Sequence, residues 1–523
     1  MKYGTVFSEN KTEKQLTFEL LATFEDICSI NVLTGMLNPA AFGNIINNLD
    51  AINQALIWIS QSNLPNESDE SEFGLSENRY KTCASFLMDY AYPYSVICSG
   101  YISLSRKRFD ATVQGKTVTF NLAEDQNQSA WSDILREAMH HSLQSVMPGT
   151  NFIKAASTFE KFKKNVRVED GWVTYSLTKE ILLPFINIAS EQWNMTKTLP
   201  ETWKFDSFTL DEYRKVWITI TGFSYLHFLS VYTIKDAFLR IKNGTIVLPK
   251  KAFIDTMASL SGVDEATVEK IVNYIVFEPS KRNVDIMYQP IVMLDNELID
   301  IAPMLFIASQ PERNLLAVVS TRRDSEYSKE VNDLEELMIQ DLENSVPQND
   351  SLKVVKHKQL GGRLPDIDFG LCDMTSNSIM LCELKWFAAA DSTKEICARE
   401  DDITHGCEQS EAVMAFAMKD KETFVKRVFN VENGAEFDLF CCVVAKHNIR
   451  TQNKHVPVID LSAIKNLFEK LPVNTVFHTI RNHEYEEKIP NNATLTHKEI
   501  KYGEFVFRIP AICFDSEWQG DSN

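Results

Sequence analysis

Two apolar runs between residues 366 and 386, interrupted by charged residues, constrain the fold more than any other feature of this sequence. The first run, Asp366–Cys372, reads DIDFGLC, and the second, Ile379–Trp386, reads IMLCELKW. The stretch between them, Met374–Ser378, is mostly small and polar, which is typical of a turn. Apolar runs of this length, rich in branched and aromatic residues and separated by turn residues, predict a β-hairpin.

The charged residues of this hairpin fall at alternate positions. Glu383 and Lys385 are two residues apart, so they face the same side of a strand, and Asp366 and Asp368 share a face in the same way. Burying such groups without partners costs about 2–7 kcal/mol each. A hydrated divalent cation resolves the conflict, because Mg²⁺ favours carboxylate oxygens. Such a cation would lower the pKa of a bound water and polarise a phosphodiester, while the lysine orients the attacking water.

The elements around the hairpin follow a defined order. A helix precedes three strands, and a second helix then leads to a fourth strand. This αβββαβ order predicts an α/β domain with a mixed sheet covered by helices. The predicted elements are the helix Lys329–Asn344, the strands Leu352–Gln359, Asp366–Cys372 and Ile379–Trp386, the helix Cys407–Met418 and the strand Asp438–Ala445.

In this order, the hairpin resembles the PD-(D/E)XK nuclease superfamily, whose fold is restriction-endonuclease-like. The resemblance covers residues 330–446 and implies hydrolysis of phosphodiester bonds with Mg²⁺ or Mn²⁺ as cofactor. Glu383 and Lys385 match the second half of the motif. Two registers are open for the first half. Pro365-Asp366 satisfies the literal motif, whereas Asp368 is the ligand when the strand is aligned with relatives that write Gly-Glu-Ile-Asp, and we favour this second register.

The resemblance also implies two residues on the flanking helices. Members of the family commonly carry an acidic metal ligand on the helix before the first strand, and Glu335 takes that place here. Many also carry a glutamine on the helix after the lysine strand, where this chain has Gln409. A solvated helix carboxylate is the alternative interpretation of Glu335.

A group of basic residues near the site indicates contact with nucleic acid. Lys353, Lys356 and Lys358 lie on the first strand of the domain, and Arg363 follows. Such residues can hold phosphates and position the backbone over the metal. A solvated edge strand whose lysines prevent aggregation is the competing explanation.

The rest of the chain is predicted to be mainly α-helical. Residues 1–280 read as helices, including Glu13–Ile27, Ala41–Ser60 and Trp131–Val146, with a small β-hairpin at 109–120. This region is expected to have a sensing or positioning role. Within it, residues 259–277 could form a helix-turn-helix or simply another helix. Short β-like runs are predicted at Ile291–Leu294 and Leu315–Ser320. The nuclease domain is then placed at 285–480, followed by a β-like extension at 481–523.

The composition limits the modes of nucleic-acid binding and the cellular location that we expect for this chain. The net charge of −19 and the pI of about 5.1 speak against a protein that coats nucleic acid nonspecifically. The ten cysteines include no CxxC pair, as expected for reduced thiols in the cytoplasm. Val216–Ile234 has no formal charge and could span a bilayer by length, but its polar residues favour a buried helix. We therefore expect a cytoplasmic protein without stable membrane association.

These features lead to two hypotheses of different classes. The first is a Mg²⁺-dependent DNA endonuclease, acting in prokaryotic defence or DNA processing. The second is a catalytically silent DNA-binding or scaffold protein that keeps the nuclease fold. The sequence has no GxxxxGK[ST] loop, so by analogy an ATPase would be a separate partner protein. Homo-oligomerisation is left open.

Overall fold

The computed structural model divides the chain into two compact units. Unit 1 contains residues 1–98, 138–328 and 500–507, and unit 2 contains 99–137, 329–499 and 508–523. The predicted boundary near 280–285 thus falls inside unit 1, and the predicted domain limits stay predictions. The residues that the structure describes are 11–35, 43–62, 64, 73–123, 150–197, 199–281, 284–322, 325–390, 392–447, 449, 451, 455–485 and 493–514. The predicted helix at 131–146 lies outside them.

Unit 1 is predominantly helical, as predicted, and carries small sheets. β5, β8, β7 and β6 form one four-stranded sheet in that order, and β3 pairs with β4. Its elements are α1 (Glu13–Gly35), α2 (Gly43–Ser60), α3 (Glu77–Ser85), the π-helix η3 (Phe86–Ala91), α4 (Tyr92–Ser105, which continues into unit 2), α6 (Thr150–Phe162), η5 (Lys163–Asn165), β3 (Arg167–Glu169), β4 (Trp172–Thr174), α7 (Lys179–Thr196), α8 (Leu210–Val231), α9 (Ala237–Lys242), β5 (Ile246–Pro249), α10 (Lys250–Ser261), α11 (Glu265–Tyr274), β6 (Val276–Phe277), β7 (Ile291–Met293), β8 (Leu298–Ile301), α12 (Pro303–Ile307) and α13 (Pro311–Arg322).

The uncharged stretch that begins at Val216 forms most of α8, a buried helix of unit 1. A capping box starts the helix, because Thr209 accepts a hydrogen bond from the backbone of Glu212 and the Glu212 side chain bonds back to Thr209. The polar residues of α8 bond internally; the hydroxyl of Ser224, for example, donates to the carbonyl of Ile220. None of the described helices is both long and apolar enough to span a membrane.

Residues 259–277 contain the end of α10, a tight turn, the whole of α11 and the short strand β6. α10 ends at Ser261, and Gly262 adopts a left-handed conformation with φ of 73°. Asp264 then caps α11 by accepting a hydrogen bond from the backbone of Thr267. The short turn with a glycine is the arrangement expected of a helix-turn-helix. Whether α11 contacts DNA stays a prediction.

One predicted strand of this region is wrong. Leu315–Ser320 lies within α13, which begins at Pro311. A short apolar run is compatible with either a strand or a buried helix. Proline is favoured in the first turn of a helix, because its missing N–H would have no helical partner there. Pro311 was therefore the local signal that the apolar run continued a helix.

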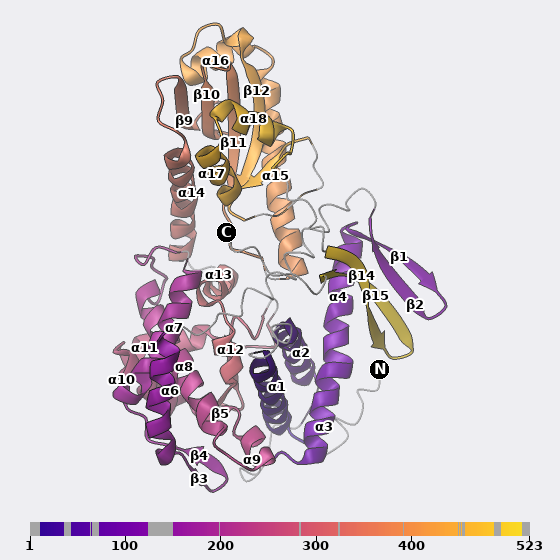
Figure 1. Cartoon of the computed structure of the whole chain (residues 1–523), viewed down its shortest axis with the longest axis vertical. Helices are drawn as coiled ribbons and strands as arrows, with labels where there is room; N and C mark the ends of the chain where they lie inside the picture. Colours follow the sequence, from indigo (N-terminus) through magenta and orange to yellow (C-terminus); the bar gives the residue numbers. More distant parts are fainter. Residues whose placement is uncertain are drawn as a thin grey trace. The chain divides into compact units, whose positions relative to one another are not determined.

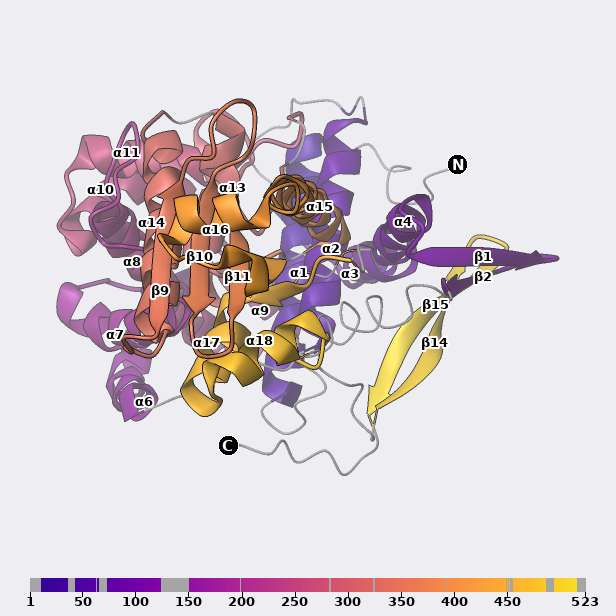
Figure 2. The same ribbon diagram turned by 90° about the horizontal axis from the view of Figure 1, so that it is seen from above.

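Unit 2 is organised around a five-stranded mixed sheet (Figures 1 and 2). The strand order is β13-β12-β11-β10-β9, with β9, β10 and β11 antiparallel and β11, β12 and β13 parallel. The predicted αβββαβ order is observed, with α16 inserted before the fourth strand. The elements are α14 (Ser325–Ser345), β9 (Leu352–Lys358), β10 (Ile367–Asp373), β11 (Ser378–Lys385), α15 (Thr393–Ala417), α16 (Lys421–Phe429), η6 (Gly434–Glu436), β12 (Asp438–Ala445), β13 (Val458–Asp460), α17 (Leu461–Lys470) and α18 (Val473–Arg481).

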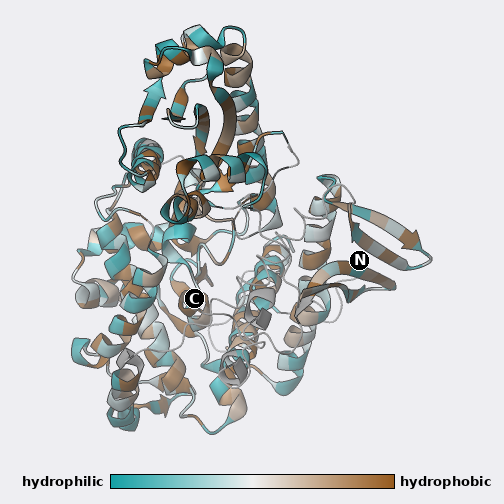
Figure 3. Ribbon diagram, turned by 45° about the horizontal axis from the view of Figure 1, so that its top comes forward, coloured by the Kyte–Doolittle hydropathy of each residue, from teal (hydrophilic) through white to brown (hydrophobic). Residues whose placement is uncertain are grey.

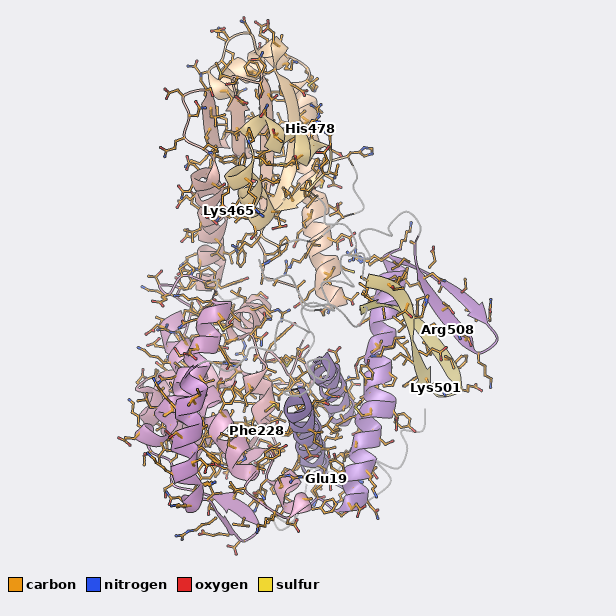
Figure 4. The ribbon with its side chains drawn as sticks, viewed as in Figure 1. Glu19, Phe228, Lys465, His478, Lys501 and Arg508 are labelled. Carbon is orange, nitrogen blue, oxygen red and sulfur yellow. The ribbon has the colours of Figure 1, made fainter. Side chains whose placement is uncertain are left out.

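Helices cover both faces of this sheet because the apolar residues alternate along the strands. On β11, Met380, Cys382 and Leu384 face a core built with α14, α17 and α18. Ile379 and Leu381 face the opposite core, built with α15 and α16. Figure 3 shows the apolar residues concentrated on the strands, between the helices. Lys465 of α17, labelled in Figure 4, donates to Asp341 of α14 at 2.6 Å and so joins two helices of the first face.

Unit 2 also includes part of a second sheet, built from segments far apart in the sequence. The predicted hairpin at 109–120 is confirmed as β1 (Phe109–Gln114) and β2 (Thr117–Leu122). β15 (Phe505–Phe514) lies next to β2, and β14 (Ala493–Tyr502) forms the far edge.

Two arginines just before β1 hold the first half of α15. Arg108 donates from Nε and Nη2 to Glu400 Oε2 at 3.1 and 2.8 Å, and both side chains are buried. Arg106 forms a two-bond pair with Asp401, at 2.7 and 2.8 Å. The segment before β1 is therefore part of the framework that fixes α15.

Candidate functional site

The candidate site lies where β10 and β11 part. The pairing of the two strands ends at Phe369 and Cys382, although β11 continues to Lys385. Beyond that point β11 pairs only with β12, and Glu383 lies beside Val443. The alternation that buries Ile379 and Leu381 against α15 and α16 continues through Glu383 and Lys385. Both charged residues therefore lie on the α15 face of the sheet.

The parting of the strands leaves backbone N–H groups of β11 without a strand partner, and a carboxylate takes that place. Asp368 Oδ2 accepts the N–H of Leu384 at 2.8 Å. Two residues further on, the N–H of Trp386 lies close enough to Glu335 of α14 to lower the pKa of that carboxyl. The Asp368 carboxylate replaces an acceptor that β10 would have supplied, and Glu335 lies beside it at the end of β11.

Lys385 is the cationic centre of the cluster. Its Nζ donates to Glu383 Oε1 at 2.7 Å and to Gln409 Oε1 at 2.9 Å. Glu383 is 8% exposed, and a buried carboxylate needs a partner of this kind. Gln409 belongs to α15, so this helix completes the coordination of the ammonium group. The carboxylates come from three different elements, α14, β10 and β11.

A glycine of α15 allows the helix to approach the site. A Cβ atom at Gly406 would lie 2.9 Å from Cε and 3.4 Å from Cγ of Lys385, and 3.5 Å from Cγ of Glu383. The first distance is shorter than side chains tolerate, so a larger residue would displace Lys385 or the helix. The motif predicts Gln409 at the site, whereas Gly406, about one helical turn earlier, was not predicted.

Burial and mutual repulsion raise the pKa values of the three carboxyls. The pKa of Glu383 is raised to about 7, chiefly by burial and then by the charges of Asp368 and Glu335, against the opposing effect of Lys385. Burial also raises the pKa of Asp368, while the N–H of Leu384 and then Lys385 lower it. Glu335 is exposed as a residue, but partial burial of its carboxyl still raises its pKa, which Lys385 lowers and Asp368 raises again. The three acids thus act on one another as a group.

Five of the predicted residues are brought together, namely Glu335, Asp368, Glu383, Lys385 and Gln409. Asp366 is exposed and precedes β10, yet its charge still raises the pKa of Asp368. Of the two registers left open by the sequence, the structure thus places Asp368 in the cluster and Asp366 at its margin.

The predicted basic residues do not form one strip. β9 is an edge strand, as the competing explanation required. Lys353 Nζ donates to the carbonyl of Asn430 at 2.9 Å, at the C-terminus of α16. Lys356 Nζ instead pairs with Glu343 of α14 at 2.7 Å. α16 and α14 cover opposite faces of the sheet, so these two lysines cannot line one side of the site. Lys358 is partly exposed, and Arg363 is exposed in the loop before β10.

A histidine that the sequence analysis did not select lies beside the cluster. His357 is flanked by Lys356 and Lys358, which pair with Phe369 and Ile367, so His357 stands across from Asp368. Its Nε2 lies 2.6 Å from Glu336 Oε2, and its charge lowers the pKa of Asp368. Its φ of 46° is unusual for a residue other than glycine within a strand, and such strain is often found at functional sites.

The donor chemistry fits a hard divalent cation. Asp368, Glu383 and Glu335 supply only oxygen atoms. The charge of Asp368 raises the pKa of both glutamates and that of Glu335 raises the pKa of Glu383, which a divalent cation bound by these acids would reverse. Within the described residues, no group of three or more His, Cys, Asp or Glu side chains is arranged to hold a metal ion. As the side chains stand, the ammonium of Lys385 is the counter-ion of Glu383.

Comparisons with protein-family models, with curated proteins and with solved structures find no match to this chain. The interpretation of the site therefore depends on its geometry and on the motif.

The raised pKa of Glu383 predicts how pH affects stability in the presence of EDTA. The folded-state pKa of about 7 lies above the ordinary 4.5, so the free energy of unfolding should fall as the pH rises from about 4.5 to 7. Glu383→Gln removes this loss, which should stabilise the protein by on the order of 2–3 kcal/mol at pH 8 and little at pH 4.5. Urea unfolding at both pH values measures the difference.

The control for this experiment is Glu408→Gln, because the Glu408 side chain is 69% exposed on α15. It should change the free energy of unfolding equally at both pH values. A Glu383→Gln variant that is no more stable at pH 8 than at pH 4.5, relative to wild type, would contradict the assigned pKa.

Proposed function

We propose that unit 2 is a metal-dependent nuclease of the PD-(D/E)XK type that hydrolyses phosphodiester bonds, with DNA as the expected substrate. The observation that carries the proposal is the ammonium of Lys385, held by Glu383 and Gln409 next to Asp368 and Glu335. The αβββαβ order supports a restriction-endonuclease-like fold, and the mixed sheet is compatible with it.

Each residue of the cluster has a task in this proposal. Asp368 and Glu383, with Glu335 close by, would hold Mg²⁺ or Mn²⁺, and the bound ion would supply Lewis-acid activation of water and phosphate. Lys385 orients the attacking water and offsets the negative charge that develops on the phosphoryl oxygens. Gln409 holds the ammonium group in place. Gly406 leaves room for that arrangement.

Substrate approach needs positive charge, because a polyanion must reach three carboxylates. His357 stands across from Asp368, and Lys358 and Arg363 lie nearby in the sequence at partly or fully exposed positions. Lys353 and Lys356 are engaged with α16 and α14, so we assign them a smaller role in DNA binding than the sequence suggested. A role in prokaryotic defence, and a partner ATPase, remain part of the proposal by analogy.

The first test is cleavage of plasmid DNA, single-stranded DNA and RNA with Mg²⁺ or with EDTA. Wild type should cleave DNA only with the metal, and Glu383→Gln and Lys385→Ala should each reduce the rate at least about 100-fold, because each removes charge stabilisation from the reacting centre. Thermal unfolding checks that the variants fold.

Glu408→Gln is the matched control and should cleave like wild type. Equal cleavage by wild type and either site variant would overturn the proposal. Binding of DNA by wild type without any cleavage would instead support the catalytically silent alternative.

The second test ranks the two aspartates. Asp368 bonds to the backbone of Leu384 inside the cluster, whereas Asp366 is exposed before β10. Asp368→Asn should therefore eliminate cleavage, and Asp366→Asn should only weaken it. Initial rates with saturating Mg²⁺ distinguish the two variants. The opposite ranking would make Asp366 the main ligand and restore the literal Pro-Asp motif.

The third test concerns the close contact of α15. Gly406→Ala should lower the cleavage rate by about 10–100-fold, since small displacements of a catalytic group are costly. Alanine favours a helix more than glycine by about 1 kcal/mol, so the variant should still fold. Glu408→Ala, on the same helix, is the control. Cleavage by Gly406→Ala at the wild-type rate would show that α15 need not approach Lys385 so closely.

A further inference from the structure

A second group of buried oxygens lies in the core of unit 1, away from the residues of the proposed nuclease site. It consists of Glu25 on α1, Asp300 on β8 and Thr245 just before β5. These residues are 1%, 0% and 2% exposed. Aspartate and glutamate are almost never buried this deeply unless a partner compensates them.

Most of these oxygens make no well-formed hydrogen bond in the described part of the chain. They are Glu25 Oε1, Asp300 Oδ1, Asp300 Oδ2 and the hydroxyl oxygen of Thr245. The Thr245 hydroxyl and the N–H of Ile301 lie close enough to Asp300 to lower its pKa, and the Ser29 hydroxyl does the same for Glu25. Glu25 Oε2 accepts the N–H of Met304 at 3.0 Å. A buried polar atom without a partner costs about 1–3 kcal/mol, and more if it is charged. Four such atoms in one place point to a group that they bind together.

The three residues act on one another. The negative charge of Asp300 raises the pKa of Glu25, although burial is the larger cause. Burial raises the pKa of Asp300, and the hydroxyl of Thr245 opposes it. A Cβ atom at Gly244 would lie 3.3 Å from Cγ of Glu25, so the segment with Thr245 packs directly on Glu25. Within the described chain, no lysine, arginine or histidine is among the groups that shift these two carboxyls.

We propose that Glu25, Asp300 and Thr245 form a binding site for one Ca²⁺ ion. Two carboxylates neutralise a divalent cation, and oxygen-only donors are those that Ca²⁺ takes at 2.3–2.6 Å. Mg²⁺ usually retains several waters, which suits a site closed to solvent less well. The ion would also explain why acids occur in this core without a basic partner. This proposal is independent of the nuclease function.

The experiment uses the full-length chain, stripped with EDTA and dialysed. Ca²⁺ added at about 100 times its dissociation constant should raise the unfolding temperature by about 5–10 °C in wild type. A shift of this size is also expected in Glu383→Gln, whose nuclease site is weakened as a cation site. Asp300→Asn and Glu25→Gln, which keep the side-chain shape, should show no shift when each is combined with Glu383→Gln. Elemental analysis after gel filtration should find one Ca²⁺ per chain in Glu383→Gln and none in the two double variants.

Three results would overturn the proposal. The first is the absence of any Ca²⁺ effect on wild type, which would mean that protons neutralise the pair. The second is an equal Ca²⁺ shift in Asp300→Asn combined with Glu383→Gln. The third is a shift lost in Glu383→Gln alone, which would place the ion at the nuclease site. If both double variants fail to fold, Thr245→Val combined with Glu383→Gln decides, and it should bind Ca²⁺ at least about tenfold more weakly while keeping the charges of Glu25 and Asp300.

Discussion

The backbone N–H groups that β11 exposes where β10 leaves it are the constraint on which the site depends. A buried N–H without an acceptor is costly, so a strand that continues alone must find other partners. Asp368 accepts the N–H of Leu384, and Glu335 lies close enough to the N–H of Trp386 for that group to lower its pKa. The Asp368 carboxylate thus stabilises the open edge of the sheet and is held in place by it, with Glu335 beside it. The bond that completes the fold here is also the bond that orients this acid.

Charge within the cluster is unbalanced, and this imbalance gives the cluster its chemistry. Three carboxylates surround one ammonium group, so Lys385 can compensate only part of their repulsion. Burial is the main reason that the pKa of Glu383 is raised to about 7, and the uncompensated repulsion adds to it. The same acids have opposite effects on folding and on binding. Their repulsion destabilises the folded protein at neutral pH, and it creates affinity for a cation that relieves the repulsion.

The sequence was sufficient for the features set by local pattern. Alternation along β10 and β11, and the polar turn between them, predicted the hairpin and the shared face of Glu383 and Lys385. Features set by tertiary packing could not be predicted from the sequence pattern. Lys353 and Lys356 looked equivalent, but alternation sends them to α16 and to α14. Leu315–Ser320 looked like a strand because a short apolar run carries no clear period. His357 had no distinguishing signal between its two lysines, since its contact with Glu336 joins residues 21 apart.

The helix that completes the site is held from a distant part of the chain. α15 presents Gly406 and Gln409 to Lys385, and one to two turns earlier it presents Glu400 to Arg108. Breaking a buried pair by removing one partner costs about 3–5 kcal/mol, because the remaining charge stays buried. A fragment beginning at residue 285, the predicted start of the nuclease domain, would lack Arg108 and leave Glu400 in that state. The folding unit is therefore not the contiguous segment that carries the motif. It requires the segment before β1, which the chain supplies about 300 residues before α15.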